Sequence, residues 1–148
     1  MDTADQLLEV YARMVSERMK SNTTTSTSEL HTYGNLYFRK GLFLGVYPSD
    51  RAPQRPPHSA FYLQNTLRSD SEDRDGHWVA VALEPGEKPL LFDSFGRTPS
   101  TTFMPHLMHA NTTDPDRNQE WESKRCGQIC LAFGHLYLNH GYPVALLA

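Results

Sequence analysis

The chain has 148 residues, of which 39% are hydrophobic and 21% charged, so it is long enough for one domain with a buried core. Its net charge of -3, with 14 Lys and Arg against 17 Asp and Glu, gives no basic surplus for binding nucleic acid. The sequence has no run of 18 apolar residues, which a membrane-spanning helix would need. Its acidic start, MDTADQ, is unlike a secretory signal. We therefore expect an intracellular protein that is not secreted and has no membrane partner.

The N-terminal part of the chain predicts one helix and a linker. Residues 2–20 place apolar side chains on one face at helical spacing and charged side chains elsewhere, which indicates an amphipathic helix. The Ser/Thr-rich tract at 21–28 has no core-forming residue and predicts a linker or mobile loop. We accordingly divide the chain into an N-terminal segment, 1–28, and a domain at 29–148.

Strand signals occupy the middle of the chain. Residues 41–57 begin as a short apolar strand and end in a Pro-rich turn, and 59–67 form another short element. The stretch HWVAVAL at 77–83 is rich in β-branched and aromatic residues, which is typical of a buried strand. After the turn EPGEKP, the stretch LLFDSFG at 90–96 predicts its antiparallel partner.

The last part of the chain predicts a loop and a buried helix. Residues 97–118 are mostly loop, with a short helix near 104–110. From Cys126 onward, CGQICLAFGHLYLNHG mixes apolar and small residues and predicts a helix buried on most sides, which Gly141 and Pro143 would end. The expected fold class is α+β, a small mixed or antiparallel sheet packed against this helix, with the site in the cleft between them.

The chain has two cysteines, Cys126 and Cys130, and both lie in this helix. They offer packing atoms, metal ligands or a nucleophile. The ligand set for a structural zinc site is incomplete, so no metal is expected. Cys130 lies one turn inside the apolar helix and fits packing. Cys126 lies at the helix start after Lys124 and Arg125, where unpaired N–H groups and the helix dipole favour a thiolate, and Gly127 leaves space for a substrate beside the sulfur.

A nucleophilic cysteine needs a base, and the base needs a group that orients it. His77 opens a predicted strand and can stand at the edge of a cleft, although a histidine in this position is more often structural or exposed to solvent. Asp93 follows three apolar residues in the partner strand, and antiparallel pairing places it on the same side of the sheet as His77. Gln119, seven residues before Cys126, could stabilise an oxyanion together with the backbone N–H groups of Cys126 and Gly127.

The order His77, Asp93, Gln119, Cys126 resembles the adenovirus-type cysteine endopeptidases, the adenain family, and more distantly the SUMO-deconjugating proteases of the same clan. HWVAVAL resembles the family's His-Trp strand, and FDSFG resembles its Phe-acid-x-Phe-Gly segment. CGQICLAF resembles its Cys-Gly nucleophile helix, including a second cysteine one turn on, and LFLGVYPSDRAP resembles its Phe-Leu-Gly segment. These motifs cover about 41–142.

The resemblance implies a cysteine endopeptidase that hydrolyses peptide bonds through a Cys-His-Asp triad and a thioester. His77 would be the base, Asp93 its orienter and Cys126 the nucleophile, with Gln119 and Gly127 in the oxyanion hole. Enzymes of this family mature virions by cutting capsid and core precursors, typically after small residues such as glycine. The chain would then be a viral or virus-like maturation protease, with precursor polypeptides as partners and the host nucleus, cytoplasm or virion as its location.

The chain departs from the adenoviral pattern in three respects. Its acid, Asp93, is an aspartate as in the SUMO proteases rather than a glutamate. No cysteine lies between Asp93 and Cys126, so a peptide or protein activator could not be disulfide-linked in the adenoviral manner. The domain is also shorter at its C-terminus. The chemistry implied by the resemblance requires no cofactor, and the charge balance does not favour a DNA activator.

Three alternative functions stay open at this point. A ubiquitin-like or SUMO-type deconjugating protease would use the same site. An acetyltransferase of a related branch would use the same triad but would need a pocket for acetyl-CoA. A catalytically inactive structural homologue would keep the fold alone.

Overall fold

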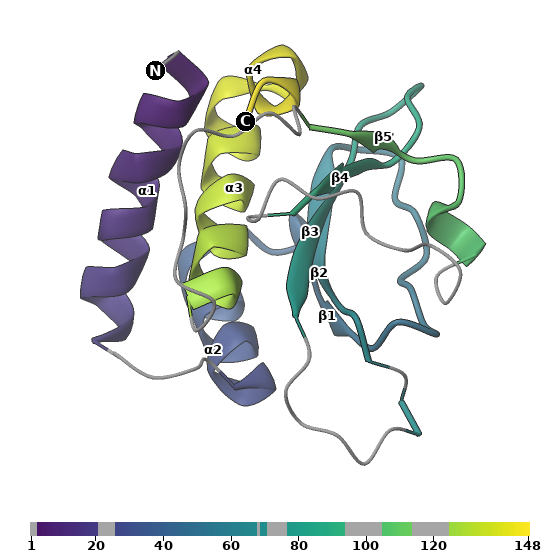
Figure 1. Ribbon diagram of the computed structural model, residues 1–148, viewed down its shortest axis with the longest axis horizontal. Coiled ribbons are helices and arrows are strands. Elements are labelled where there is room, and N and C mark those ends of the chain that lie inside the picture. The colour runs from purple at the N-terminus through teal and green to yellow at the C-terminus, as the bar shows by residue number, and fades with distance from the viewer. Residues whose placement is uncertain (1–2, 21–25, 68, 71–76, 94–104, 114–124) are drawn as a thin grey trace.

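The computed structural model describes residues 3–20, 26–67, 69–70, 77–93, 105–113 and 125–148. Its helices and strands, in chain order, are α1 (Thr3–Met19), α2 (Thr27–Tyr37), β1 (Phe43–Tyr47), β2 (Ala60–Asn65), β3 (Trp78–Leu83), β4 (Leu90–Phe92), a 3-10 helix (Pro105–Leu107), β5 (Asn111–Thr112), α3 (Cys126–His140) and α4 (Tyr142–Leu146). The fold is therefore mixed α+β, which confirms the expected class (Figure 1).

The five strands form one mixed sheet in the order β1-β2-β3-β4-β5. The central pairs β2–β3 and β3–β4 are antiparallel, whereas the edge pairs β1–β2 and β4–β5 are parallel. The predicted hairpin is confirmed for its described part, because Ala80 lies opposite Phe92 and Ala82 lies opposite Leu90. Within the described ranges, β4 ends at Phe92, and residues 94–96 of the predicted strand lie outside them.

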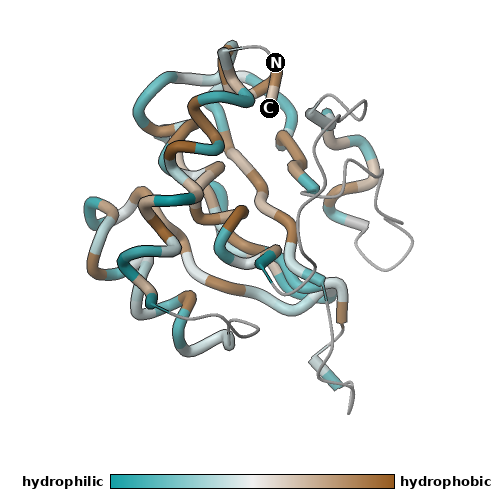
Figure 2. The backbone as a smooth tube through the Cα atoms, turned by 60° about the vertical axis from the view of Figure 1, so that its left-hand side comes forward, coloured by the Kyte–Doolittle hydropathy of each residue, from teal (hydrophilic) through white to brown (hydrophobic). Residues whose placement is uncertain are grey.

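Both faces of the sheet are covered. Trp78, Ala80 and Ala82 of β3 belong to the large core cluster shared with the helices, whereas Val79 and Val81 belong to a second cluster on the other face. Figure 1 shows α1, α2 and α3 on one side of the sheet and the 3-10 helix on the other. Because every residue of β3 is buried, the strand is apolar throughout rather than alternating. In Figure 2 the hydrophobic segments run through the middle of the fold and the hydrophilic ones through its outer turns.

Helix α3 is the centre of the helical layer, and every residue from Cys126 to Tyr137 is buried. This confirms the predicted buried helix. Gly134 permits a close approach to the sheet, since a Cβ at this position would collide with the ring of Phe61 on β2. Gly141, with a φ of 89°, ends the helix as predicted.

The direction of α3 along the sheet follows from two contacts. The Cys130 thiol donates to the backbone oxygen of Trp78 at 3.4 Å, and the Tyr137 hydroxyl donates to a Glu84 carboxylate oxygen at 3.4 Å. Helix α3 therefore runs alongside β3 in the same direction. Its first turn lies at the end of the sheet where β3 begins and β4 ends.

The N-terminal helices belong to the same core. Helix α1 confirms the helix predicted at 2–20, and it buries Ala4, Leu8, Ala12 and Val15. Within the described ranges, no helix has the length and apolar character needed to cross a membrane.

Helix α2 corrects the interpretation of the Ser/Thr-rich tract. Residues 21–25 of that tract lie outside the described residues, but Thr27 and Ser28 begin a helix rather than continue a linker. The Ser26 hydroxyl accepts from the Glu29 backbone N–H at 3.1 Å, and the Glu29 carboxylate accepts from the Ser26 backbone N–H at 3.2 Å. This capping box fixes the start of α2, so the boundary predicted after residue 28 falls inside its first turn.

Candidate active site

His77 is held at the start of β3 by its own backbone. Its backbone N–H donates to the Thr66 hydroxyl at 2.9 Å, and its carbonyl accepts from the Thr66 backbone N–H at 2.9 Å. These bonds extend the β2–β3 ladder one residue beyond the pair Asn65 and Trp78. The backbone at His77, the residue before β3, is therefore bonded to Thr66 through both its N–H and its carbonyl.

Asp93 follows β4 directly and lies beside His77. Asp93 is the residue after Phe92, the last residue of β4, whose partner on β3 is Ala80. The Asp93 Oδ1 atom lies 2.7 Å from the Nε2 atom of His77, and the Asp93 side chain is only 2% exposed. The imidazole N–H thus donates to a carboxylate that is almost completely excluded from water.

Cys126 is the first residue of α3 and is 4% exposed. The residue before it, Arg125, makes no side-chain capping hydrogen bond to the helix, and the first turn contains no acidic residue. Backbone N–H groups at the start of a helix attract negative charge. The Cys126 side chain therefore lies at the positive end of the helix dipole.

The three side chains form one interacting set. Burial alone would lower the pKa of His77, but hydrogen bonds to Asp93 and Cys126 and the charges of both partners raise it to about 9. At neutral pH the ring is therefore an imidazolium that lies beside a sulfur atom.

His77 interacts with both other members of the set. Its Nε2 atom is engaged by Asp93, and the same ring is hydrogen-bonded to the Cys126 side chain. Such a pair can activate a nucleophile and then donate the proton to a leaving group.

The predicted oxyanion donors are described in part. Gln119 lies outside the described residues, whereas Gly127 is the second residue of α3. The prediction that Gly127 leaves space for a substrate is wrong. A Cβ on Gly127 would lie 3.1 Å from Cδ2 of Leu30 and 3.4 Å from Cδ1 of Trp78, so the missing side chain serves packing instead.

Cys130 is completely buried, and its thiol donates to the Trp78 carbonyl. This environment agrees with its interpretation as a packing residue. Within the described part of the chain, no group of three or more histidine, cysteine or acidic side chains is arranged to hold a metal ion.

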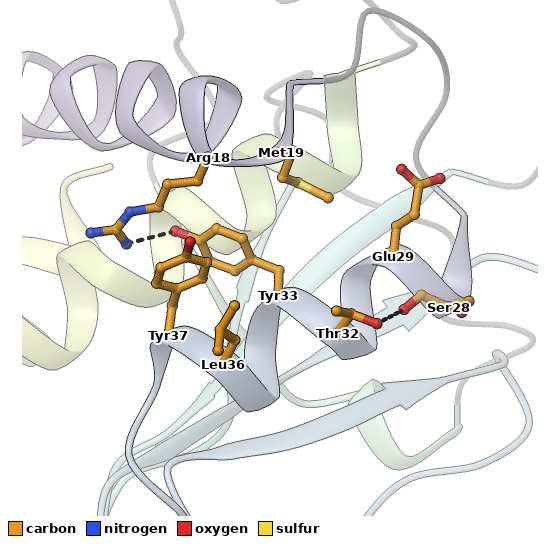
Figure 3. Close-up of a pocket in the computed structure, with 8 residues that line it drawn as sticks. All are labelled: Arg18, Met19, Ser28, Glu29, Thr32, Tyr33, Leu36 and Tyr37. Atoms are coloured by element: carbon orange, nitrogen blue, oxygen red, sulfur yellow. Dashed lines mark hydrogen bonds between the residues drawn. The ribbon is translucent and has the colours of Figure 1, made fainter.

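A separate cavity of about 270 Å³ lies between the end of α1 and the outer face of α2 (Figure 3). Its lining includes the Arg18 guanidinium, which lies 4.3 Å from the centre of the Tyr37 ring, and none of His77, Asp93 or Cys126. The cavity is therefore distinct from the interacting set at Cys126.

Two residues that shape the site escaped the sequence analysis. Thr66 holds the backbone of His77, and Leu30 covers Gly127. The sequence does signal the start of the helix that carries Leu30, because Ser26 and Glu29 have the spacing of a capping box, but it does not signal the contact with Gly127. Thr66 offers no comparable signal, since its role depends on the register between β2 and β3.

No model of a known protein family matches the sequence, and no curated protein is significantly similar to it.

Proposed function

We propose that the chain is a cysteine endopeptidase in which Cys126 is the nucleophile, His77 the general acid and base, and Asp93 the residue that orients the imidazole. The observation that carries this proposal is the interacting set of the Cys126 thiol, the His77 ring and the Asp93 carboxylate at the start of α3. A buried carboxylate behind a histidine that is itself beside a cysteine is the arrangement that nucleophilic acyl transfer requires.

In the first step the Cys126 thiolate attacks the carbonyl carbon of the scissile peptide bond. The oxygen becomes negatively charged and accepts hydrogen bonds from the Gly127 backbone N–H and, under this proposal, from the Gln119 amide. The His77 imidazolium gives its proton to the leaving nitrogen as the C–N bond breaks. The products are a thioester on Cys126 and a free amine.

In the second step water attacks the thioester. The His77 imidazole, now neutral, accepts a proton from the water, and the Cys126 sulfur leaves as a thiolate. Asp93 keeps the ring orientation constant through both steps, because its oxygen stays on Nε2.

We further propose that the chain is an adenain-type enzyme with precursor polypeptides of a virus or virus-like element as its substrates. The support is the order of its motifs, with HWVAVAL before FDSFG and CGQICLAF last, together with a helix that begins at the cysteine. Under this proposal the preferred cleavage follows small residues such as glycine.

The experiment that tests this proposal combines thiol labelling with peptide cleavage. Iodoacetamide labelling of each cysteine is followed against pH by mass spectrometry, and cleavage is followed with a fluorogenic peptide library in which the residue before the bond is glycine or alanine. We expect Cys126 to be labelled rapidly well below pH 8.5, the value of an ordinary thiol, and Cys130 to be protected. Peptide cleavage should occur in the wild type and be abolished in Cys126→Ala.

Two variants provide the controls. His77→Ala should remove both the fast labelling at low pH and the cleavage. Cys130→Ala should leave both unchanged, since this thiol lies in the core. Slow labelling of Cys126 that is indifferent to His77, with no cleavage of any peptide, would refute the proposal.

A further inference from the structure

The first turn of α3 is enclosed by two large side chains from other elements. Leu30 of α2 and Trp78 of β3 both lie against Gly127, the residue after the proposed nucleophile. Leu30 is completely buried and Trp78 is 6% exposed. Because a Cβ on Gly127 would already be closer than usual to Leu30, the backbone of the first turn is in direct contact with this side chain.

Leu30 is itself held by fixed contacts on α2. The capping box at Ser26 and Glu29 sets the start of the helix one residue before it. One turn further on, the Tyr33 hydroxyl donates to Nε2 of His135 on α3 at 2.8 Å. The same hydroxyl accepts from Arg18 of α1 at 3.1 Å, as Figure 3 shows. Contacts both before and after Leu30 along α2 therefore fix its position against α3.

The contact matters because of what Gly127 provides. Its backbone N–H lies in the first turn of α3, where backbone donors have no partner within the helix. A donor must be aimed at the oxyanion within a few tenths of an ångström to stabilise a transition state, so a rigid first turn is a catalytic requirement. The Cys126 sulfur needs no such donor to react with an alkylating reagent.

We propose that Leu30 is a positioning residue for peptide hydrolysis, which holds the Gly127 N–H in place as the oxyanion donor. This inference rests on the proposed function. Under this proposal Leu30 acts through its packing against Gly127 in the first turn of α3. Its loss should therefore impair transition-state stabilisation far more than it impairs the reactivity of the thiol.

The test compares two reactions in four variants. Leu30→Ala should lower kcat/KM for peptide cleavage about tenfold. This loss is smaller than the ~10²–10³-fold loss expected when an oxyanion donor is removed outright. The rate of iodoacetamide labelling at Cys126 should change less than about twofold, because alkylation passes through no oxyanion. The control is Leu8→Ala, which truncates an equally buried leucine of α1 in the same core and should affect cleavage little.

The Gly127→Ala variant adds a test of the contact itself. Alone, its new Cβ presses on Leu30 and should reduce cleavage at least about tenfold for the same reason. Combined with Leu30→Ala, the Cβ gains room and refills part of the lost volume, so the double variant should cleave faster than either single variant. Should Leu30→Ala fail to fold, Leu30→Val carries the same comparison with a smaller truncation.

The outcomes separate this inference from the proposed function. If the wild type cleaves no peptide, the proposed function fails and the role of Leu30 fails with it. If the wild type cleaves peptides but Leu30→Ala lowers cleavage and alkylation equally, the inference alone is wrong. The same holds if the effects of Leu30→Ala and Gly127→Ala simply multiply in the double variant.

Discussion

At the residue scale, His77 shows how neighbouring side chains set the charge of a buried ring. Burial acts to lower its pKa, but the contacts with Asp93 and Cys126 prevail and raise it to about 9. The charge on the ring is therefore a property of the assembled site rather than of histidine itself, and changes at either partner should be visible in the titration of the ring.

Asp93→Asn should lower the pKa of His77 towards its ordinary value of 6.5, because an amide oxygen stabilises an imidazolium less than a carboxylate does. The measurement is the pH dependence of the His77 ring signals by NMR. His135 provides an internal control, since burial and Arg18 hold its pKa at about 4 and it should not respond. An unchanged titration of His77 would show that Asp93 is not its electrostatic partner. Peptide cleavage should also fall, by up to the ~10⁴-fold seen when an orienting aspartate is replaced in a serine protease.

The raised pKa of His77 also predicts a pH-dependent contribution to stability. Because the folded value of about 9 lies above the unfolded value of 6.5, the contribution is fully present below pH 6.5 and is lost as the pH rises through 9. The difference between 6.5 and about 9 corresponds to on the order of 3 kcal/mol. We expect His77→Gln to reduce the free energy of unfolding more at pH 6 than at pH 10, measured by urea denaturation. An equal reduction at both pH values would contradict this prediction.

At the element scale, α2 depends on its capping box. Ser26→Ala removes the oxygen that accepts from the Glu29 backbone N–H, and it should lower the free energy of unfolding by about 1 kcal/mol. Thr32→Ala is the matched control, because the Thr32 hydroxyl donates to the Ser28 carbonyl within the helix, a contact that contributes little to helix stability. Equal destabilisation by the two substitutions in chemical denaturation would show that the cap has no special role.

The elements also show how far the sequence determines the fold. Helix α1 was predicted from the helical spacing of its apolar residues, and β3 and α3 were predicted from continuous runs of apolar and small residues. Helix α2 was missed, since its polar first turn resembles a linker and only the cap distinguishes it. Strand β5 has two residues and pairs in parallel with β4, so no local pattern could reveal it.

In the candidate site, too, local features could be predicted from the sequence and long-range packing could not. The predicted hairpin already brought Asp93 and His77 to the same end of the sheet, because pairing between neighbouring strands is encoded locally. The packing of Leu30 on Gly127 was not predictable, since it joins residues at opposite ends of the chain. From the sequence, Gly127 was therefore expected to leave space for a substrate, whereas in the structure Leu30 and Trp78 pack against it.

At the scale of the whole molecule, His135 belongs to a chain of hydrogen bonds that links α1, α2 and α3. Its Nε2 atom accepts from Tyr33 of α2, which in turn accepts from Arg18 of α1. Burial and the nearby Arg18 charge lower the pKa of His135 to about 4. Because this folded value lies below the unfolded value of 6.5, its contribution to stability is present above pH 6.5 and is lost as the pH falls through 4.

The acid sensitivity of the fold should therefore depend on His135. We expect the free energy of unfolding of the wild type to fall between pH 6.5 and 4, and His135→Phe to show a shallower fall because its ring cannot gain a proton. Phenylalanine keeps a ring against Phe38, whose centre lies 4.2 Å from that of His135. Urea denaturation at several pH values makes the comparison, and identical slopes would contradict the assignment. Together with the opposite effect of His77, this predicts a maximum of stability near pH 6.5.

Under the proposed function, the burial of α3 from Cys126 to Tyr137 limits how one copy of the chain can be cut by another. A peptide bond can be cut only when its segment enters an active site in extended form, and the bonds from Cys126 to Tyr137 are in a helix with every residue buried. Their exposure requires global opening of the fold rather than a local fluctuation. Self-digestion would therefore begin elsewhere in the chain, and the helix that carries the nucleophile would be among the last segments to be degraded.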